Sequence, residues 1–241
     1  MRVLILIIYS ESSIYKQMMN LQKKYIHNFN NVDSYFIQMR ENQISDLEIE
    51  DDIIFVKGEE NFLTILYKTI KSIEYLFEKK NYDFLIRTNI STILNIPKLL
   101  LYLHDINSKE HLYTGGSFFW YLQWLDHRSG IIDKTFWGTS FMGGTSITLS
   151  ETTVKHILNN KNNLKYDIID DVALGIYIKQ YLPEAIENGG NKLSKIYYTN
   201  IEKKEELQNN YINYEFYRNW HMDRNNDLQI MELLITLLYV K

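Results

Sequence analysis

The sequence predicts an α/β fold with a mostly parallel, doubly wound sheet that is flanked by helices. The run at 3–8 is apolar throughout, which is typical of a parallel strand buried on both faces. Further candidate strands alternate along the chain with segments of helical periodicity, and this alternation favours parallel strands joined by helical crossovers. The candidate strands lie at 3–8, 32–37, 53–56 and 84–86.

The helices are predicted from apolar periodicity and from residues that can begin a helix. The serines within 10–13 and Ser150 are suited to cap helices, and Pro97 suits a first helical turn. The segment 113–144 is rich in Gly, Ser, Trp and Phe, and we expect it to form irregular strands and loops around a pocket. The predicted helices span 14–26, 61–78, 96–104, 151–158, 172–182 and 227–240.

Composition excludes several classes of protein. The 241 residues carry a net charge of −4, which provides no electrostatic surface for nucleic acid. The chain has no cysteine, and therefore neither a disulfide scaffold nor a thiolate metal site. No stretch approaches the roughly 20 apolar residues of a membrane span. We expect a single domain at 1–241, with a nucleotide-binding half at about 1–105 and an acceptor and catalytic half at about 106–241; the sequence leaves the oligomeric state open.

The strand predicted at 84–86 runs directly into a cluster of polar side chains. Arg87, Asn89 and Ser91 follow it, and ligands of open α/β sheets bind beyond the carboxyl ends of the strands. A guanidinium can hold a diphosphate through paired hydrogen bonds, and the amide and the hydroxyl can offer oxygens. The alternative is structural, because Asn and Ser are also common in turns.

Two carboxylates, Asp170 and Asp171, stand just before the helix predicted from 172. A carboxylate in this position can cap the helix, and it can also act as general base on an acceptor hydroxyl. The two roles are compatible, because a helix N-terminus favours the ionised form. Together with the first polar cluster, these carboxylates suggest an enzyme that transfers a sugar from a nucleotide donor.

Short motifs occur in order between about residues 50 and 180. They are Glu60, Phe62, Lys68 and Thr69, then Asn95, Leu99 and Leu100, then 141–150, then Asp170-Asp171-Val172 with Gly175. In this order they resemble the inverting glycosyltransferase family that includes Fringe and many galactosyl- and N-acetylglucosaminyltransferases. The resemblance implies a GT-A-like fold, a nucleotide-sugar donor with UDP-sugar favoured, and a glycan or glycoprotein acceptor. It also implies inversion, with Asp171 favoured over Asp170 as the catalytic base.

Asn89-Ile90-Ser91 stands where that family has the metal-binding Asp-x-Asp motif. Neutral oxygens are weaker ligands for Mn²⁺ or Mg²⁺ than carboxylates, which leaves two interpretations. In one, Asn89 and Ser91 still bind a metal, weakly and only together with the nucleotide, helped by Asp170 or His221. In the other, the enzyme is metal-independent and fixed cations neutralise the diphosphate. The candidate cations are Lys68, Arg87, Arg218 and Arg224.

Gly143 and Gly144 lie in the segment that resembles the family's glycine-rich strand. They can serve close packing of the backbone, or they can let the donor sugar approach the backbone, which would make them donor-binding residues. The four tryptophans of the chain are interpreted as core rather than as platforms for a sugar.

Two other functions stay open. Loss of the Asp-x-Asp carboxylates would suit a catalytically inactive scaffold that binds a nucleotide sugar or a glycan. A nucleotidyltransferase is disfavoured, because 9–12 lacks the Gly-rich phosphate loop expected after a first strand. Heavy use of Asn, Ile and Lys, with a first strand that begins at residue 3, suits a cytoplasmic enzyme of an A/T-rich microbe, or of a large DNA virus in its host's cytoplasm.

Overall fold

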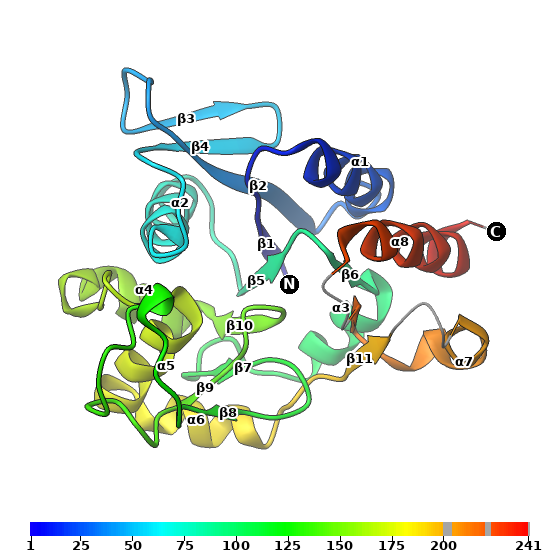
Figure 1. Ribbon diagram of the computed structural model, residues 1–241. Helices are drawn as coiled ribbons and strands as arrows, with labels where there is room; N and C mark the ends of the chain where they lie inside the picture. The colour runs from blue at the N-terminus through cyan, green and yellow to red at the C-terminus, as the bar shows by residue number, and fades with distance from the viewer. Residues whose placement is uncertain (200–203, 220–222, 241) are drawn as a thin grey trace.

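A central sheet runs through the middle of the molecule (Figure 1). The computed structural model describes residues 1–199, 204–219 and 223–240, and within them the sheet has seven strands. Their order is β3 (Leu47–Glu50), β4 (Ile53–Lys57), β2 (Val32–Arg40), β1 (Val3–Ile8), β5 (Phe84–Asn89), β10 (Ile147–Ser150) and β7 (Tyr113–Thr114). The four strands β4, β2, β1 and β5 pair in parallel, whereas β3, β10 and β7 pair antiparallel with their neighbours.

Helices cover both faces of this sheet (Figure 1). One face carries α1 (Ser13–Ile26), α3 (Ile96–His104) and α8 (Arg224–Tyr239). The other carries α2 (Ile65–Lys79), α4 (Glu151–Asn159), α5 (Asp170–Tyr181) and α6 (Pro183–Gly190). The side chains of β1 divide strictly between these faces: Leu4 and Leu6 enter one core, and Val3, Ile5 and Ile7 enter the other. The predicted α/β class, with a mostly parallel sheet between two helical layers, is therefore confirmed.

The structure also contains elements that the sequence patterns did not indicate. A small sheet joins β11 (Ile196–Thr199), β12 (Phe216–Asn219) and β6 (Thr92–Leu94), and a two-stranded ribbon joins β8 (Trp120–Tyr121) and β9 (Ser140–Phe141). α7 spans Lys204–Asn210, and 3₁₀ turns occur at His127–Ser129, Lys161–Asn163 and Tyr211–Asn213. The small sheet was missed because β6 is only three residues long and pairs with β12, more than 120 positions away.

Three predicted helix starts shift by two residues or more: α8 begins at Arg224 rather than at 227, and two others shift for local reasons. α2 begins at Ile65 rather than at 61, because the Asn61 carboxamide oxygen accepts hydrogen bonds from the amides of Leu63 and Thr64 and forms a turn. α5 begins at Asp170, two residues before the predicted start. Both carboxylates therefore belong to its first turn, where backbone N–H groups are free to receive them.

The two halves drawn at about residue 105 interleave in space. α8 packs against α1, β12 pairs with β6, and β10 lies between β5 and β7 in the central sheet. Each half thus contributes to both cores. In the described part of the chain, no helix combines the length and apolarity needed to cross a membrane.

Candidate active site

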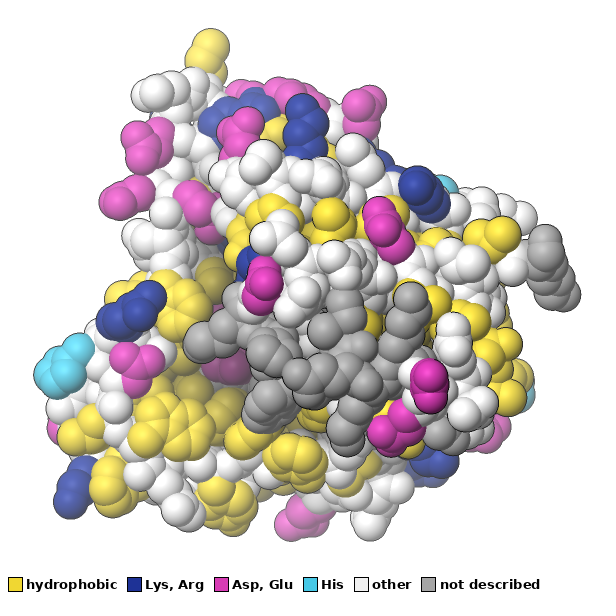
Figure 2. Space-filling view, turned by 45° about the vertical axis from the view of Figure 1, so that its right-hand side comes forward, with side chains coloured by type: hydrophobic (Ala, Val, Ile, Leu, Met, Phe, Trp, Pro, Cys, Tyr) yellow, Lys and Arg dark blue, Asp and Glu magenta, His cyan; other side chains and the backbone are white. Residues whose placement is uncertain are grey.

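A cleft opens above the carboxyl ends of β1 and β5. Ligands of open α/β sheets bind in this position. Its main cavity has a volume of about 710 Å³, and a second cavity of about 380 Å³ continues from it past Asn89, Arg218 and Arg224. The second cavity is bordered by the residues after β1, 8–10, and by Tyr15. Figure 2 shows hydrophobic side chains gathered below a recess on this side of the molecule.

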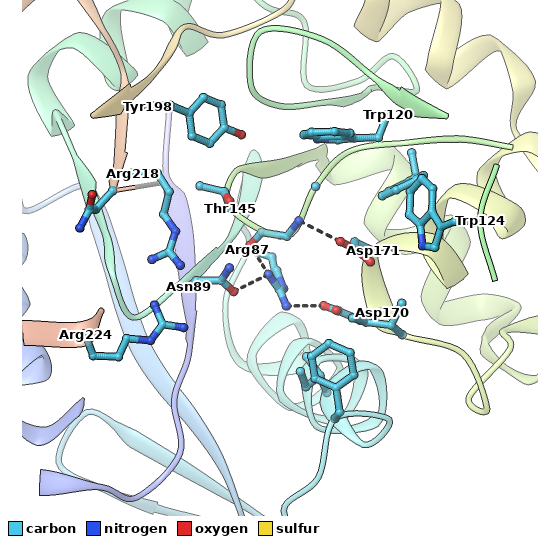
Figure 3. A pocket seen from close by; sticks show the side chains of 17 residues that line it. Arg87, Asn89, Trp120, Trp124, Thr145, Asp170, Asp171, Tyr198, Arg218 and Arg224 are labelled. Atoms are coloured by element: carbon cyan, nitrogen blue, oxygen red, sulfur yellow. Dashed lines mark hydrogen bonds and ion pairs between the residues drawn. The ribbon is translucent and has the colours of Figure 1, made fainter. Parts of the chain in front are cut away.

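Arg87 lies in the floor of the main cavity and is 3% exposed. Its Nη2 is 2.6 Å from Asp170 Oδ2, and its Nη1 donates to Asn89 Oδ1 at 2.8 Å and to the carbonyl of Gly144 (Figure 3). The sequence places Arg87 at the ligand crevice, and the structure does so too. Its charge, however, is already balanced by a buried carboxylate, so its first role is to position Asp170 and Asn89.

Asp171 presents its carboxylate to the same cavity, beside the buried Arg87–Asp170 pair (Figure 3). Its Oδ2 accepts a hydrogen bond from the Gly144 amide at 3.2 Å, and its Oδ1 accepts one from the Val172 amide at 2.8 Å. Burial, reinforced by the charge of Asp170, raises the pKa of Asp171 from 3.8 to about 6, although Arg87 and the two amides oppose the shift. A base with a pKa in this range is ionised at neutral pH and accepts protons well.

The Gly143–Gly144 pair allows two side chains to approach the backbone. A Cβ on Gly144 would lie 2.3 Å from Arg87 Nη1, and a Cβ on Gly143 would lie 3.0 Å from Trp120 Nε1. Both glycines line the cavity. Arg87 and Trp120 fill the space that their missing side chains leave, and donor binding by these glycines stays a prediction.

Two further arginines line both cavities. Arg224 is partly neutralised, since its Nη1 is 2.6 Å from Asp227 Oδ2 and 3.3 Å from Ser91 Oγ. Arg218 is different: its Nη1 is buried and has no hydrogen-bond partner among the described residues. Burial, with the nearby charge of Arg224, lowers the pKa of Arg218, although the Asp227 carboxylate opposes the shift. A buried guanidinium nitrogen without a partner favours an anionic ligand.

Lys68 lies outside the cavity linings. Its side chain is fully buried, and its ammonium group donates to Glu60 at 2.6 Å and to the carbonyl of Tyr9 at 2.9 Å. The sequence resemblance made Lys68 a donor-binding candidate. The structure instead uses it to fasten α2 to the end of β1, so any effect on the donor is indirect.

The described residues do not fit a resident divalent metal. No group of three His, Asp or Glu side chains suited to hold an ion occurs in the described ranges. Asn89 Oδ1 and Ser91 Oγ, the candidate ligands, already accept hydrogen bonds from Arg87 and Arg224. A divalent cation placed there would lie against two guanidinium groups, at a Coulombic cost. His221, the third candidate, lies outside the described residues.

Several cavity residues were not singled out from the sequence. Trp120 and Trp124, interpreted as core, line the main cavity, and Trp124 is 40% exposed. Tyr198 lines it from β11, a strand that the patterns did not predict. The available signal was the concentration of aromatic residues in 113–144, which does not by itself distinguish a core from a binding wall.

The family model described as Galactosyltransferase matches residues 37–187. Among solved structures, a glycosyltransferase involved in the glycosylation of the major capsid of PBCV-1 is 12% identical, with a TM-score of 0.47, over 97% of this chain and 100% of that one. Galactosyltransferase LgtC in complex with donor and acceptor sugar analogs is 10% identical, with a TM-score of 0.43, over 100% and 98% of the two chains. Likeness at this level identifies neither donor nor acceptor, and no curated protein matches the sequence.

Proposed function

The chain belongs to the galactosyltransferase family and is a glycosyltransferase; we propose that it moves a hexose from a UDP-sugar to a hydroxyl of a glycan or glycoprotein, with inversion. One observation carries the proposal. A carboxylate with a pKa of about 6, Asp171, faces the same cavity as the half-buried Arg218, whose Nη1 is buried without a hydrogen-bond partner among the described residues. The first is suited to remove a proton from an acceptor, and the second to receive a phosphate.

The reaction is a single displacement at the anomeric carbon. Asp171 accepts the proton of the acceptor hydroxyl while that oxygen forms the new bond to the anomeric carbon. The bond from this carbon to the diphosphate breaks at the same time, and its electron pair leaves with the phosphate oxygen. The charge that develops there is met by Arg218 and Arg224, which are already in place and need no reorganisation.

We propose that these arginines take the part that a metal ion plays in many transferases. The supporting observation is that the oxygens of Asn89 and Ser91 face guanidinium groups. The alternative is an ion bound weakly through phosphate oxygens and water, only when the nucleotide is present. Calorimetric titration of Mn²⁺ into the protein with and without UDP distinguishes the two alternatives. An ion bound together with the nucleotide predicts a heat of Mn²⁺ binding in the sample with UDP, whereas neutralisation by the arginines predicts none.

A catalytically inactive scaffold that binds a nucleotide sugar or a glycan is the second candidate. It is favoured by a single observation, the neutral Asn-x-Ser sequence at 89–91. It predicts donor binding with neither hydrolysis nor transfer. The proposed enzyme should at least hydrolyse its donor slowly, because water can take the place of the acceptor beside Asp171.

A screen of donor hydrolysis tests the proposal. UDP-, GDP- and TDP-sugars are incubated with the protein in EDTA or in Mn²⁺, and release of the nucleoside diphosphate is measured. We expect release from a UDP-sugar that persists in EDTA, and an Asp171→Asn variant without it. Turnover only in Mn²⁺ would return the metal to the mechanism, and binding without turnover of any donor would establish the scaffold. NMR of the product's anomeric configuration decides between inversion and retention.

A further inference from the structure

The walls of the main cavity differ in chemistry on the two sides of Asp171 (Figure 3). Figure 3 shows Arg218, Arg224 and Asn89 together on one side of Asp171 and Trp124 on the other, with Trp120 between Tyr198 and Trp124. The diphosphate of the donor requires the side that carries the arginines. The aromatic side is therefore left for the acceptor. Resting on the proposed function, we propose that Trp120 and Trp124 form the acceptor subsite and that they bind a neutral sugar ring.

The two indole rings are held in place by the surrounding structure. Trp120 lies on β8 opposite Phe141 of β9, against Gly143, and its ring is tilted against Phe118 at 4.9 Å. Trp124 meets Phe141 edge-on at 5.8 Å and remains 40% exposed. An anchored aromatic face at a cavity wall offers apolar area at little conformational cost.

A pyranose suits such a wall because it has two kinds of surface. Its C–H face is apolar and gains from burial against an indole, while its hydroxyl groups lie around the edge of the ring. A sugar lying on Trp120 and Trp124 can therefore turn one hydroxyl toward Asp171. A nucleobase could also stack on an indole, but the second cavity, which is lined by both arginines and by Tyr15, offers separate space for the nucleoside.

The charges near this wall argue for a neutral acceptor. Of the described residues that line the cavity, the cations are Arg87, Arg218 and Arg224. Arg87 is balanced by Asp170, and the other two lie on the opposite side of Asp171 (Figure 3). A uronic acid on the aromatic wall would thus place its carboxylate beside the Asp171 carboxylate without a described cation to balance it, which is unfavourable.

Saturation-transfer NMR tests this subsite without requiring turnover. The probes are methyl galactoside, methyl glucoside, methyl N-acetylglucosaminide and methyl glucuronide, each with the wild-type protein in the presence of UDP. We expect saturation of at least one neutral glycoside and none of the glucuronide. Trp124→Ala and Trp120→Ala should raise the Kd of that glycoside at least about fivefold, a loss on the scale of one packed aromatic contact.

Trp137→Ala is the matched control, since Trp137 belongs to the same segment, is 39% exposed and is absent from the cavity lining. It should leave the glycoside Kd unchanged, and Trp124→Phe should recover most of the wild-type affinity. UDP affinity in all these variants should stay within about twofold of wild type. An unchanged glycoside Kd in both alanine variants, no saturation by any neutral glycoside, or a loss of UDP affinity at Trp124 would each overturn the inference. Donor hydrolysis by the wild-type protein is independent of these results, so the proposed function can stand when the subsite fails.

Discussion

Neighbouring groups have opposing electrostatic effects on the Asp171 carboxylate. It stands in the first turn of α5, where the helix terminus favours an ionised carboxylate by about 0.3–1 kcal/mol near a surface. Arg87 and two backbone amides act in the same direction. Burial and the charge of Asp170 act against them and prevail, because desolvation of a carboxylate can shift its pKa by several units. The result is a carboxylate with a pKa of about 6, which suits the proposed role of base.

The pH dependence of transfer follows from this balance. Asp171 acts as a base only when ionised, so kcat/KM should rise as the pH increases through about 6 and level off above it. Asp171→Asn should lower kcat about 10²–10⁴-fold and abolish this ionisation, because the amide accepts no proton. The exposed Asp167, four residues earlier, provides the control variant Asp167→Asn. A wild-type profile that is flat between pH 5 and 8 would remove Asp171 from the role of base.

Arg218 should contribute directly to the affinity for the nucleotide. Arg218→Ala removes a guanidinium whose buried Nη1 has no partner among the described residues, and calorimetry with UDP should show binding weaker by about 1.5–3 kcal/mol, the scale of a charged hydrogen bond. Arg128→Ala, on an exposed turn away from the cleft lining, is the control. Equal UDP affinity in the Arg218 variant and wild type would assign this residue a structural role.

Between β9 and β10, the backbone at Gly144 connects Asp171 to Arg87. The Gly144 amide donates to Asp171, and its carbonyl accepts from Arg87. One short loop thus holds two charged groups of opposite sign at fixed positions. This arrangement depends on the absence of a side chain at 144.

Gly144→Ala tests that dependence. The added Cβ would lie 2.3 Å from Arg87 Nη1, so the guanidinium must move, and we expect a loss of about 1–3 kcal/mol in a urea unfolding experiment. Because Arg87 lowers the pKa of Asp171, its displacement should also move the midpoint of the pH–rate profile above 6. Gly190→Ala, where a Cβ would meet nothing within 4 Å, is the control. Equal stability of both variants would show that the close packing is dispensable.

Elements with local sequence signals were predicted well, and elements defined by distant partners were not. β1, α1, α3 and α4 carry apolar periodicity, a capping Ser or Asn, or an early Pro, and each of these acts within a few residues. β6, β11 and β12 are three or four residues long and exist through pairing with one another. Short strands of this kind carry too little periodicity to be recognised along the sequence.

The cleft depends on the whole molecule, because its lining comes from segments far apart in the chain. Residues after β1 and β5 meet the 120–124 loop, the start of α5, and Tyr198, Arg218 and Arg224 of the last third. A ligand bound there contacts both halves, and it binds the folded state alone. It should therefore stabilise the entire fold.

A thermal unfolding experiment measures this effect. UDP at 100 times its Kd should stabilise the protein by about 2.7 kcal/mol and raise its Tm, in EDTA as well as in Mn²⁺. Asp171→Asn should keep the shift, because the base is proposed to act on the acceptor. Uridine, which lacks the diphosphate, is the control and should give a much smaller shift. A Tm increase that appears only with Mn²⁺ would contradict neutralisation by arginines.

The sequence by itself determined the fold class, most helices, the crevice at the end of β5, and the glycosyltransferase family. Each depends on local patterning or on motifs in a fixed order. The tertiary structure alone decided which side chains are available for a ligand: it paired Arg87 with Asp170, buried Lys68 against Glu60, and turned Trp120 and Trp124 toward the cavity. Residue type gives the charge and shape of a group, but its partners are set by segments that meet only in the folded chain, and those partners determine whether the charge is free to act.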